Sequence, residues 1–144
     1  MKIFITLLMT LSLIYAAEID EFASEVNYLR DYKTAVKKAK EQNKMIMLVV
    51  VGDYCPWCKK FERKTLKSSE VMAQADENFV GLVIDKYKDK GNYPKAFFSS
   101  LIPAVFFVDP TSEKSLLETV AYMKKDEFLE NMDDALSLYE QKRK

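Results

Sequence analysis

The chain of 144 residues contains no histidine, and this absence excludes several kinds of catalytic site. Neither a Cys–His pair nor a Ser–His–Asp triad can be formed for nucleophilic catalysis. A c-type haem attachment motif needs a histidine directly after its second cysteine, and Lys59 stands in that place. Structural zinc usually takes four cysteine or histidine ligands, and the chain offers only two. We therefore expect neither a metal site nor a bound cofactor.

Cysteine, glycine and proline are also scarce, and neither sign of charge dominates. Two cysteines are too few for a framework of structural disulfides. With three glycines and four prolines, the boundaries of helices and strands must be found mostly from hydrophobic periodicity. The 22 basic and 22 acidic residues balance, so the composition gives no support for nucleic acid or an anionic membrane as a partner.

The N-terminus has the pattern of an export signal. Lys2 precedes an apolar run of 13 residues, Ile3 to Tyr15, and Ala16-Ala17 offers a small-residue cleavage site. A membrane-spanning helix needs about 20 apolar residues, so an uncleaved anchor is the less favoured alternative. We predict a signal peptide over residues 1–16, a loosely ordered acidic leader over 17–28 and one domain over 29–144. No stable membrane anchor is expected after cleavage at Ala16 or Ala17.

The only two cysteines lie in the sequence Cys55-Pro56-Trp57-Cys58, between a predicted strand and a predicted helix. The apolar run at residues 45–51 favours a strand buried on both faces. Pro56 suits the first position of the helix that follows, because its missing N–H would have no partner there. As a purely structural feature, the pair would be a local disulfide or two buried thiols. A disulfide that closes so short a loop adds little stability, so a redox role is the better interpretation.

The remaining periodicity predicts alternating helices and strands. The order of these elements, with a hairpin near the C-terminus, is typical of a mixed α/β sheet with helices on both faces. Helices are predicted over residues 29–42, 56–67, 68–75, 93–100 and 126–141, and strands over 45–51, 79–85, 102–108 and 116–121.

Two segments resemble the thioredoxin superfamily. The first is the strand that runs into Tyr54-Cys55-Pro56-Trp57-Cys58-Lys59, and the second is Ile102-Pro103-Ala104-Val105-Phe106-Phe107 downstream. The resemblance extends over about residues 29–138, and residues 35–60 are similar to exported bacterial thioredoxin-like proteins. It implies the thioredoxin fold, with a central mixed sheet of four to five strands flanked by helices on both faces.

The position of the dithiol predicts different roles for its two cysteines. Cys55 would lie at the start of a helix, where free N–H groups and the helix dipole favour a thiolate. Cys55 is therefore the candidate nucleophile, and Cys58, one turn later, is the resolving thiol. Lys59 either adds positive potential or points into solvent. Tyr54, Pro56 and Trp57 are expected to line the site.

Trp57 and the segments around it have two interpretations each. Trp57 is either an apolar contact surface for partner chains or a cover for the helix start that packs on Tyr54. The resemblance implies a cis bond between Ile102 and Pro103, lying against the dithiol and binding substrate; the alternative is an ordinary trans proline. Tyr122, beside Ala121, is either a further wall of the groove or, more simply, part of a connector.

One position departs from the family pattern. Many thioredoxins have a buried acid in the strand six residues before the first cysteine, and here that residue is Val49. Proton transfer to Cys58 must then use water, Asp53, Glu62 or the substrate.

The sequence therefore predicts an exported thiol–disulfide oxidoreductase in the bacterial periplasm that acts on protein thiols and disulfides. In oxidising members of the family that it resembles, a histidine between the two cysteines stabilises the thiolate, and here no histidine lies between Cys55 and Cys58. The resemblance therefore favours a reductant, which would receive its electrons from a membrane electron-transfer partner, over an oxidant. A first alternative is a thioredoxin-fold binding or chaperone-like module with an incidental dithiol. A second is a metal-handling protein that uses both thiolates with a second copy of the chain.

Overall fold

The sheet is built around β1 (Met45–Val51), a strand of seven apolar residues that are all buried. In the computed structural model, which describes residues 18–144, β1 pairs in parallel with β2 (Phe79–Asp85) and antiparallel with β3 (Ala104–Asp109). The edge strand β4 (Lys114–Val120) pairs antiparallel with β3, so the order is β2-β1-β3-β4. Because β1 has strands on both sides and helices on both faces, none of its side chains meets water.

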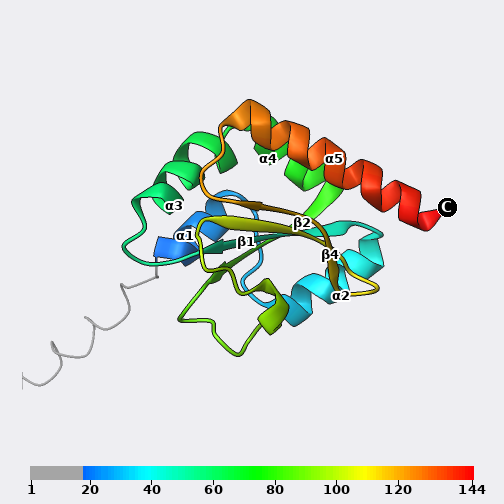
Figure 1. The fold of residues 1–144 in the computed structure, drawn as a ribbon, viewed down its shortest axis with the longest axis horizontal. Helices are drawn as coiled ribbons and strands as arrows, with labels where there is room; N and C mark the ends of the chain where they lie inside the picture. Colours follow the sequence, from blue (N-terminus) through cyan, green and yellow to red (C-terminus); the bar gives the residue numbers. More distant parts are fainter. Residues whose placement is uncertain (1–17) are drawn as a thin grey trace, which may run out of the picture.

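Helices cover both faces of this sheet (Figure 1). Successive residues of β1 point to opposite faces, so Met47 and Val49 enter one core while Leu48 and Val50 enter the other. The predicted α/β architecture is thereby confirmed. The first face is covered by α1 (Glu18–Glu25), α3 (Pro56–Phe61), α4 (Ser69–Asn78) and α5 (Lys125–Arg143), and the second by α2 (Tyr32–Gln42).

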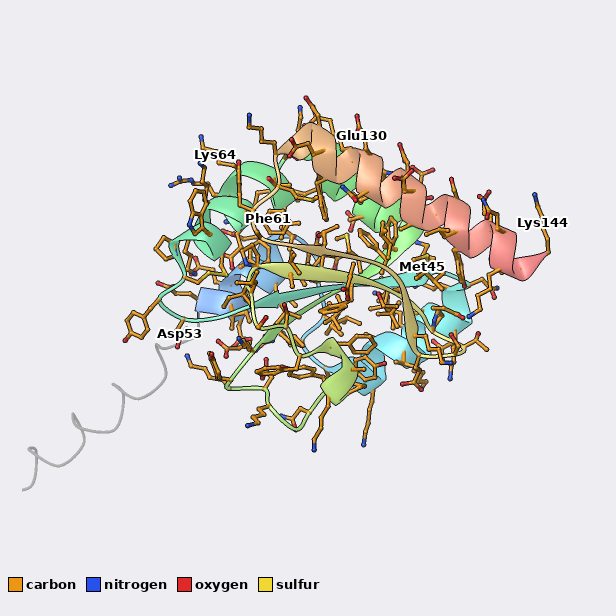
Figure 2. The ribbon with its side chains drawn as sticks, viewed as in Figure 1. Met45, Asp53, Phe61, Lys64, Glu130 and Lys144 are labelled. Atoms are coloured by element: carbon orange, nitrogen blue, oxygen red, sulfur yellow. A yellow bond between two sulfur atoms is a disulfide. The ribbon has the colours of Figure 1, made fainter. Side chains whose placement is uncertain are left out.

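Side chains of the helices divide between the core and the surface. Phe61 of α3 is buried against the sheet, whereas Lys64 and Glu130 point outward (Figure 2). Within residues 18–144, no helix combines the length and the apolar character needed to cross a bilayer. The predicted signal peptide lies outside the described residues.

The segment before residue 29 differs from its prediction. Residues 18–25 form α1, and Phe22, Ala23 and Val26 are buried in the same core as Met47. The prediction of a loosely ordered leader is therefore wrong for this segment. These three residues share one face of a helix by their spacing, but the many acidic side chains around them concealed this short apolar face.

The predicted helix over residues 29–42 begins later than expected. Its N-cap is Asp31, whose carboxylate accepts a hydrogen bond from the N–H of Thr34 at 2.7 Å. Leu29 instead forms a parallel bridge with Leu82, at the edge of the sheet. The C-terminus is as expected, because Asn43 closes α2 in a left-handed conformation with φ 53°.

Two other predicted helices are also modified. The helix over residues 56–67 is α helical only to Phe61 and continues as one π-helical turn, η1 (Glu62–Leu66). The prediction of a helix over residues 93–100 is wrong, since only a 3₁₀ turn, η2 (Lys95–Phe97), forms there. The Ser99 hydroxyl donates to the Leu101 carbonyl at 2.6 Å, a local bond that favours a turn over a helix.

Candidate functional site

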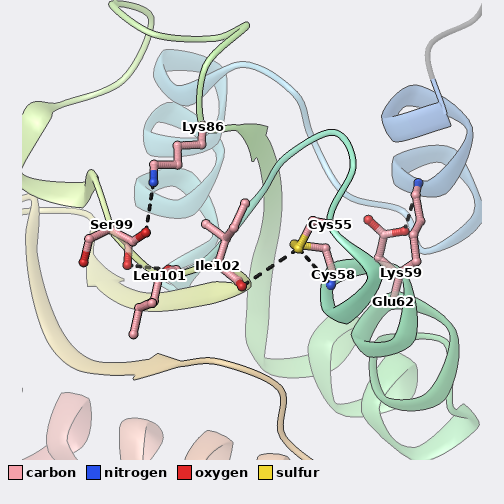
Figure 3. The surroundings of a disulfide bond; sticks show 9 residues. Cys55, Cys58, Lys59, Glu62, Lys86, Ser99, Leu101 and Ile102 are labelled. Atoms are coloured by element: carbon pink, nitrogen blue, oxygen red, sulfur yellow. Dashed lines mark hydrogen bonds and ion pairs between the residues drawn. A yellow bond between two sulfur atoms is a disulfide. The ribbon is translucent and has the colours of Figure 1, made fainter.

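The two cysteines form a disulfide at the start of α3 (Figure 3). Cys55 is the N-cap of the helix, with extended backbone angles, and Pro56 occupies the first turn as predicted. The N–H of Cys58 donates to Sγ of Cys55 at 3.1 Å. When the disulfide is reduced, the same N–H and the helix dipole are placed to stabilise a negative charge on that sulfur.

The two sulfurs differ in their access to solvent. Cys58 is 1% exposed and packs in the core beneath α3, whereas Cys55 is only partly buried. A molecule that approaches from outside therefore meets Cys55 first. This asymmetry is what an attacking thiol and a resolving thiol would require.

The Ile102–Pro103 segment lies directly against the dithiol. The bond between these residues is cis, as the family resemblance implies, and the carbonyl oxygen of Ile102 is 3.9 Å from Sγ of Cys55. The Pro103 carbonyl accepts a hydrogen bond from the N–H of Ala121 at 2.8 Å, which fastens the turn to the end of β4. A strand-to-helix turn and a proline turn thus meet where the two central strands, β1 and β3, come to the same end of the sheet.

Gly52 allows this close approach. A Cβ atom at position 52 would lie 2.8 Å from Cδ1 of Ile102, closer than real Cβ contacts. Glycine at this position therefore leaves room for the end of the Ile102 side chain, which would have to shift if a Cβ atom were present.

Tyr122, not Tyr54, supports Trp57. The Trp57 and Tyr122 rings lie 5.7 Å apart between centroids, and Nζ of Lys60 lies over both rings, at 5.1 and 4.7 Å. Tyr54 is fully exposed, so the suggested packing of Trp57 on Tyr54 is wrong. Tyr122 also meets Phe61 edge-on and is more than a connector. Trp57 stays 57% exposed beside the dithiol and presents apolar surface to solvent.

No acid lies inside the sheet at the family position, since Val49 is fully buried among apolar residues. Of the alternatives, Asp53 is exposed and pairs with Lys88 at 2.6 Å, on the outer side of the turn. Glu62 is 7% exposed, one turn beyond Cys58 on the same helical segment. Burial raises the pKa of the Glu62 carboxyl, and the ammonium of Lys59 partly opposes this shift.

Lys59 points toward α1 and not freely into solvent. Its Nζ lies 2.8 Å from the carboxylate of Glu18 and 3.6 Å from that of Glu62 (Figure 3 shows the bond between Lys59 and Glu62). The side chain remains about half exposed. The positive potential expected of Lys59 is thus shared between two carboxylates.

Lys86 is a site residue that the sequence did not single out. It is 5% exposed, and its Nζ donates to the Ser100 carbonyl at 3.1 Å, just before the Ile102–Pro103 turn. Figure 3 shows it reaching toward that turn. The ammonium also faces the rings of Phe98 and Tyr87, at 4.8 and 5.1 Å. In the sequence Lys86 is one of several lysines in a charged loop, and only its place directly after β2 sets it apart.

Residues 18–144 place no three histidine, cysteine, aspartate or glutamate side chains where they could hold a metal ion. The surface around Cys55 is instead apolar, with Trp57 and Leu101 both more than half exposed. Such a surface suits contact with another polypeptide.

Comparison with known proteins places residues 27–110 in a family described as thioredoxin-like. Two curated relatives are similar in sequence. Anterior gradient protein 3 of Xenopus tropicalis is 24% identical over 91 residues, covering 62% of this chain and 54% of that protein. Thiol:disulfide interchange protein DsbD of Colwellia psychrerythraea is 30% identical over 109 residues, covering 72% of this chain and 18% of that protein. The chain thus spans about half of the first relative and about a fifth of the second.

Solved structures show the same fold. A DsbH oxidoreductase aligns with a TM-score of 0.63 and 23% identity, over 76% of this chain and 84% of its own. A thioredoxin from Thermus thermophilus aligns with a TM-score of 0.64 and 16% identity, over 76% and 86%. The oxidised C-terminal domain of Neisseria meningitidis DsbD aligns with a TM-score of 0.59 and 23% identity, over 75% and 98%. These likenesses confirm the predicted thioredoxin fold.

Proposed function

Since this chain belongs to the thioredoxin-like family, we propose that it is a thiol–disulfide oxidoreductase acting on protein substrates through Cys55 and Cys58. The observation that carries the proposal is the asymmetry of the pair, with Cys55 accessible at the start of α3 and Cys58 buried behind it. In this class of protein the dithiol itself is the redox group. No further cofactor is part of the proposal.

In the reducing direction the reaction has two displacement steps. The Cys55 thiolate attacks one sulfur of a target disulfide, so that a mixed disulfide forms and the other target sulfur leaves as a thiolate, which takes up a proton. The Cys58 thiol then loses its proton and attacks Sγ of Cys55. The mixed disulfide breaks, the second target thiolate is released, and two electrons have passed from the protein to its target. The same steps in reverse insert a disulfide.

Glu62 is the proposed acceptor of the Cys58 proton. Its carboxyl lies one turn beyond Cys58, is nearly buried, and has a pKa raised by that burial. A carboxyl whose pKa is closer to neutral exchanges protons with a thiol more readily than an ordinary exposed one. Glu62 would thus take the role of the buried acid that many thioredoxins have in the strand, at the position where this chain has Val49.

The proposed substrate site is the surface between the two turns. The Ile102 backbone next to Pro103 would pair with an extended segment of the target, which aligns its disulfide with Sγ of Cys55. The exposed faces of Trp57 and Leu101 would contact apolar side chains on either side of that disulfide.

Export to the periplasm and a reducing role complete the proposal. The support for export is the predicted signal peptide over residues 1–16, and the support for reduction is the absence of histidine between Cys55 and Cys58. A reductant in an oxidising compartment must be re-reduced, so a membrane electron-transfer protein is the proposed partner. The equilibrium of the dithiol with glutathione tests the direction: a potential near −270 mV (about the value of thioredoxin) supports a reductant, and one near about −120 mV an oxidant.

Cysteine replacements test the activity itself. Cys55→Ser should abolish exchange with protein disulfides, and Cys58→Ser should accumulate mixed disulfides through Cys55 that a thiol reagent releases. Full exchange activity in Cys55→Ser would overturn the proposal. If instead a partner binds equally well when both cysteines are replaced and in both redox states, the protein is a binding module with an incidental dithiol.

A further inference from the structure

An open surface groove of about 370 Å³ lies between α1 and the helical segment that follows the dithiol. Charged side chains of both signs surround it. On one side are residues of α1, and on the other are residues of α3, η1 and its C-cap. They are Glu18, Glu21 and Glu25 on the first side, and Lys59, Glu62, Arg63 and Lys67 on the second. The N-terminal helix therefore faces the dithiol region across a charged gap.

Within this gap two carboxylates compete for one ammonium. Nζ of Lys59 lies 2.8 Å from Glu18 and 3.6 Å from Glu62. The Glu18 side chain is 82% exposed and the Glu62 side chain only 9%. An exposed carboxylate stays hydrated while it pairs with Lys59, whereas the charged form of Glu62 is penalised by burial.

We propose that Glu18 is a positioning residue for Lys59 beside the dithiol: it draws the Lys59 ammonium toward α1 and thereby leaves the Glu62 carboxyl with only the longer contact, at 3.6 Å, to that counter-ion. This inference rests on the proposed function, in which Glu62 accepts the Cys58 proton. It makes α1 a part of the redox site. The helix is fastened at a second point by the ion pair between Lys67 and Glu25, which keeps Glu18 within reach of Lys59.

The directions of the pKa shifts agree with this arrangement. The hydrogen bond and the charge of Lys59 lower the pKa of Glu18, which marks Glu18 as the closer partner. Burial raises the pKa of Glu62, Lys59 and Lys67 act against that rise, and the charge of Glu18 adds to it. Without Glu18, the Lys59 ammonium is free to turn fully to Glu62 and to favour its charged form.

The test is the titration of Glu62 in Glu18→Gln. Because an exposed charge acts weakly through solvent, we expect the acid dissociation constant of Glu62 to rise on the order of threefold, measured by NMR of the side-chain carboxyl carbon in the oxidised protein. The rate at which Cys58 resolves the mixed disulfide falls at acid pH as Glu62 is protonated. In Glu18→Gln this fall should move to lower pH by the logarithm of the same factor.

Two controls separate positioning from a general loss of charge. Glu21→Gln removes the same charge from the same helix and groove and should change the Glu62 constant by less than half as much. In a Lys59→Gln background, Glu18→Gln should likewise lose most of its effect. An unchanged Glu62 titration in Glu18→Gln, or an equal change in Glu21→Gln, would overturn the inference. Since the titration needs no substrate, it can fail while the Cys55→Ser test of function still succeeds, and the reverse.

Discussion

Nζ of Lys86 donates to the carbonyl oxygen of Ser100 at 3.1 Å, and this bond holds the loop that leads into the Ile102–Pro103 turn. Lys86 is almost wholly buried, and its ammonium also faces two aromatic rings. A buried charge with so few partners is costly unless the contact it makes is needed. We therefore assign the orientation of the turn beside Cys55 to Lys86.

Lys86→Met keeps most of the length of the unbranched side chain but removes the donor to Ser100. The protein should lose about 1–2 kcal/mol of unfolding free energy, because the Ser100 carbonyl is left without that partner. Exchange with a protein disulfide should slow several-fold through KM, while reaction with a small disulfide reagent stays the same. The exposed Lys90 provides the control Lys90→Met, which should change neither rate. Equal slowing toward both kinds of disulfide would show that Lys86 does not act through the turn.

Gly52→Ala tests the contact between the two turns of the site. The new methyl group would lie 2.8 Å from Cδ1 of Ile102, so the Ile102 side chain must shift, at a cost of about 1–2 kcal/mol. We expect a matching fall in denaturation midpoint and slower exchange. The double variant Gly52→Ala/Ile102→Val removes the clashing Cδ1 atom and should recover most of the loss. Failure of the second substitution to rescue the first would argue against this contact as the cause.

Tyr122→Ala removes the ring on which Trp57 packs. Trp57 is the only tryptophan in the chain, so its fluorescence reports directly on its surroundings. We expect emission to move to longer wavelength and the free energy of unfolding to fall by about 2 kcal/mol, because the contacts of the ring with Trp57 and Phe61 and its buried area are lost together. Tyr54→Ala is the matched control, since the exposed Tyr54 should affect neither quantity. A spectrum that changes only in Tyr54→Ala would refute the assigned packing.

The lowered pKa of Asp109, at the end of β3, predicts how the free energy of unfolding depends on pH. Burial alone would raise the pKa of Asp109, but hydrogen bonds from Lys142, Ser112 and the N–H of Thr111 hold it at about 2, below its usual 3.8. A depressed folded-state pKa stabilises the protein above the unfolded value, here by about 2 kcal/mol, and this stability is lost as the pH falls from 3.8 to about 2.

Asp109→Asn should therefore lose about 2 kcal/mol at neutral pH and show a shallower fall in stability below pH 3.8, measured by urea unfolding at several pH values. The exposed Asp134 offers the control Asp134→Asn, for which we expect an unchanged acid dependence. If Asp109→Asn had the same acid limb as the unaltered protein, another carboxylate would be responsible.

Much of the fold was predictable because its signals are local. The apolar run of β1 and the Cys55–Cys58 spacing can be recognised without knowledge of their neighbours. The cis bond before Pro103 was predicted from the resemblance to a family and could not have been predicted from the residues alone. The short helix α1 was missed because its few apolar residues have meaning only when a core lies opposite them.

The remaining site residues could not be found in this way, because their partners are distant in sequence. In the sequence Lys86 is one lysine among several, and only the structure shows that its ammonium donates to the Ser100 carbonyl, 14 positions later. Tyr122 resembles a connector until α3 brings Trp57 against it. Glu62 was one of several possible proton carriers, and only burial beside Lys59 distinguishes it from the exposed Asp53.

The sequence by itself determined the alternation of helices and strands, the redox pair and its place before a helix, because these depend on neighbouring residues and on hydrophobic period. Tertiary structure decided which sulfur is accessible, which carboxyl is buried and which helix supplies the partner of Lys59. Those properties depend on burial and on distances between segments, and burial exists only once the helices pack on the sheet. The Cys55–Cys58 motif is therefore encoded locally, whereas its surroundings are set by the whole domain.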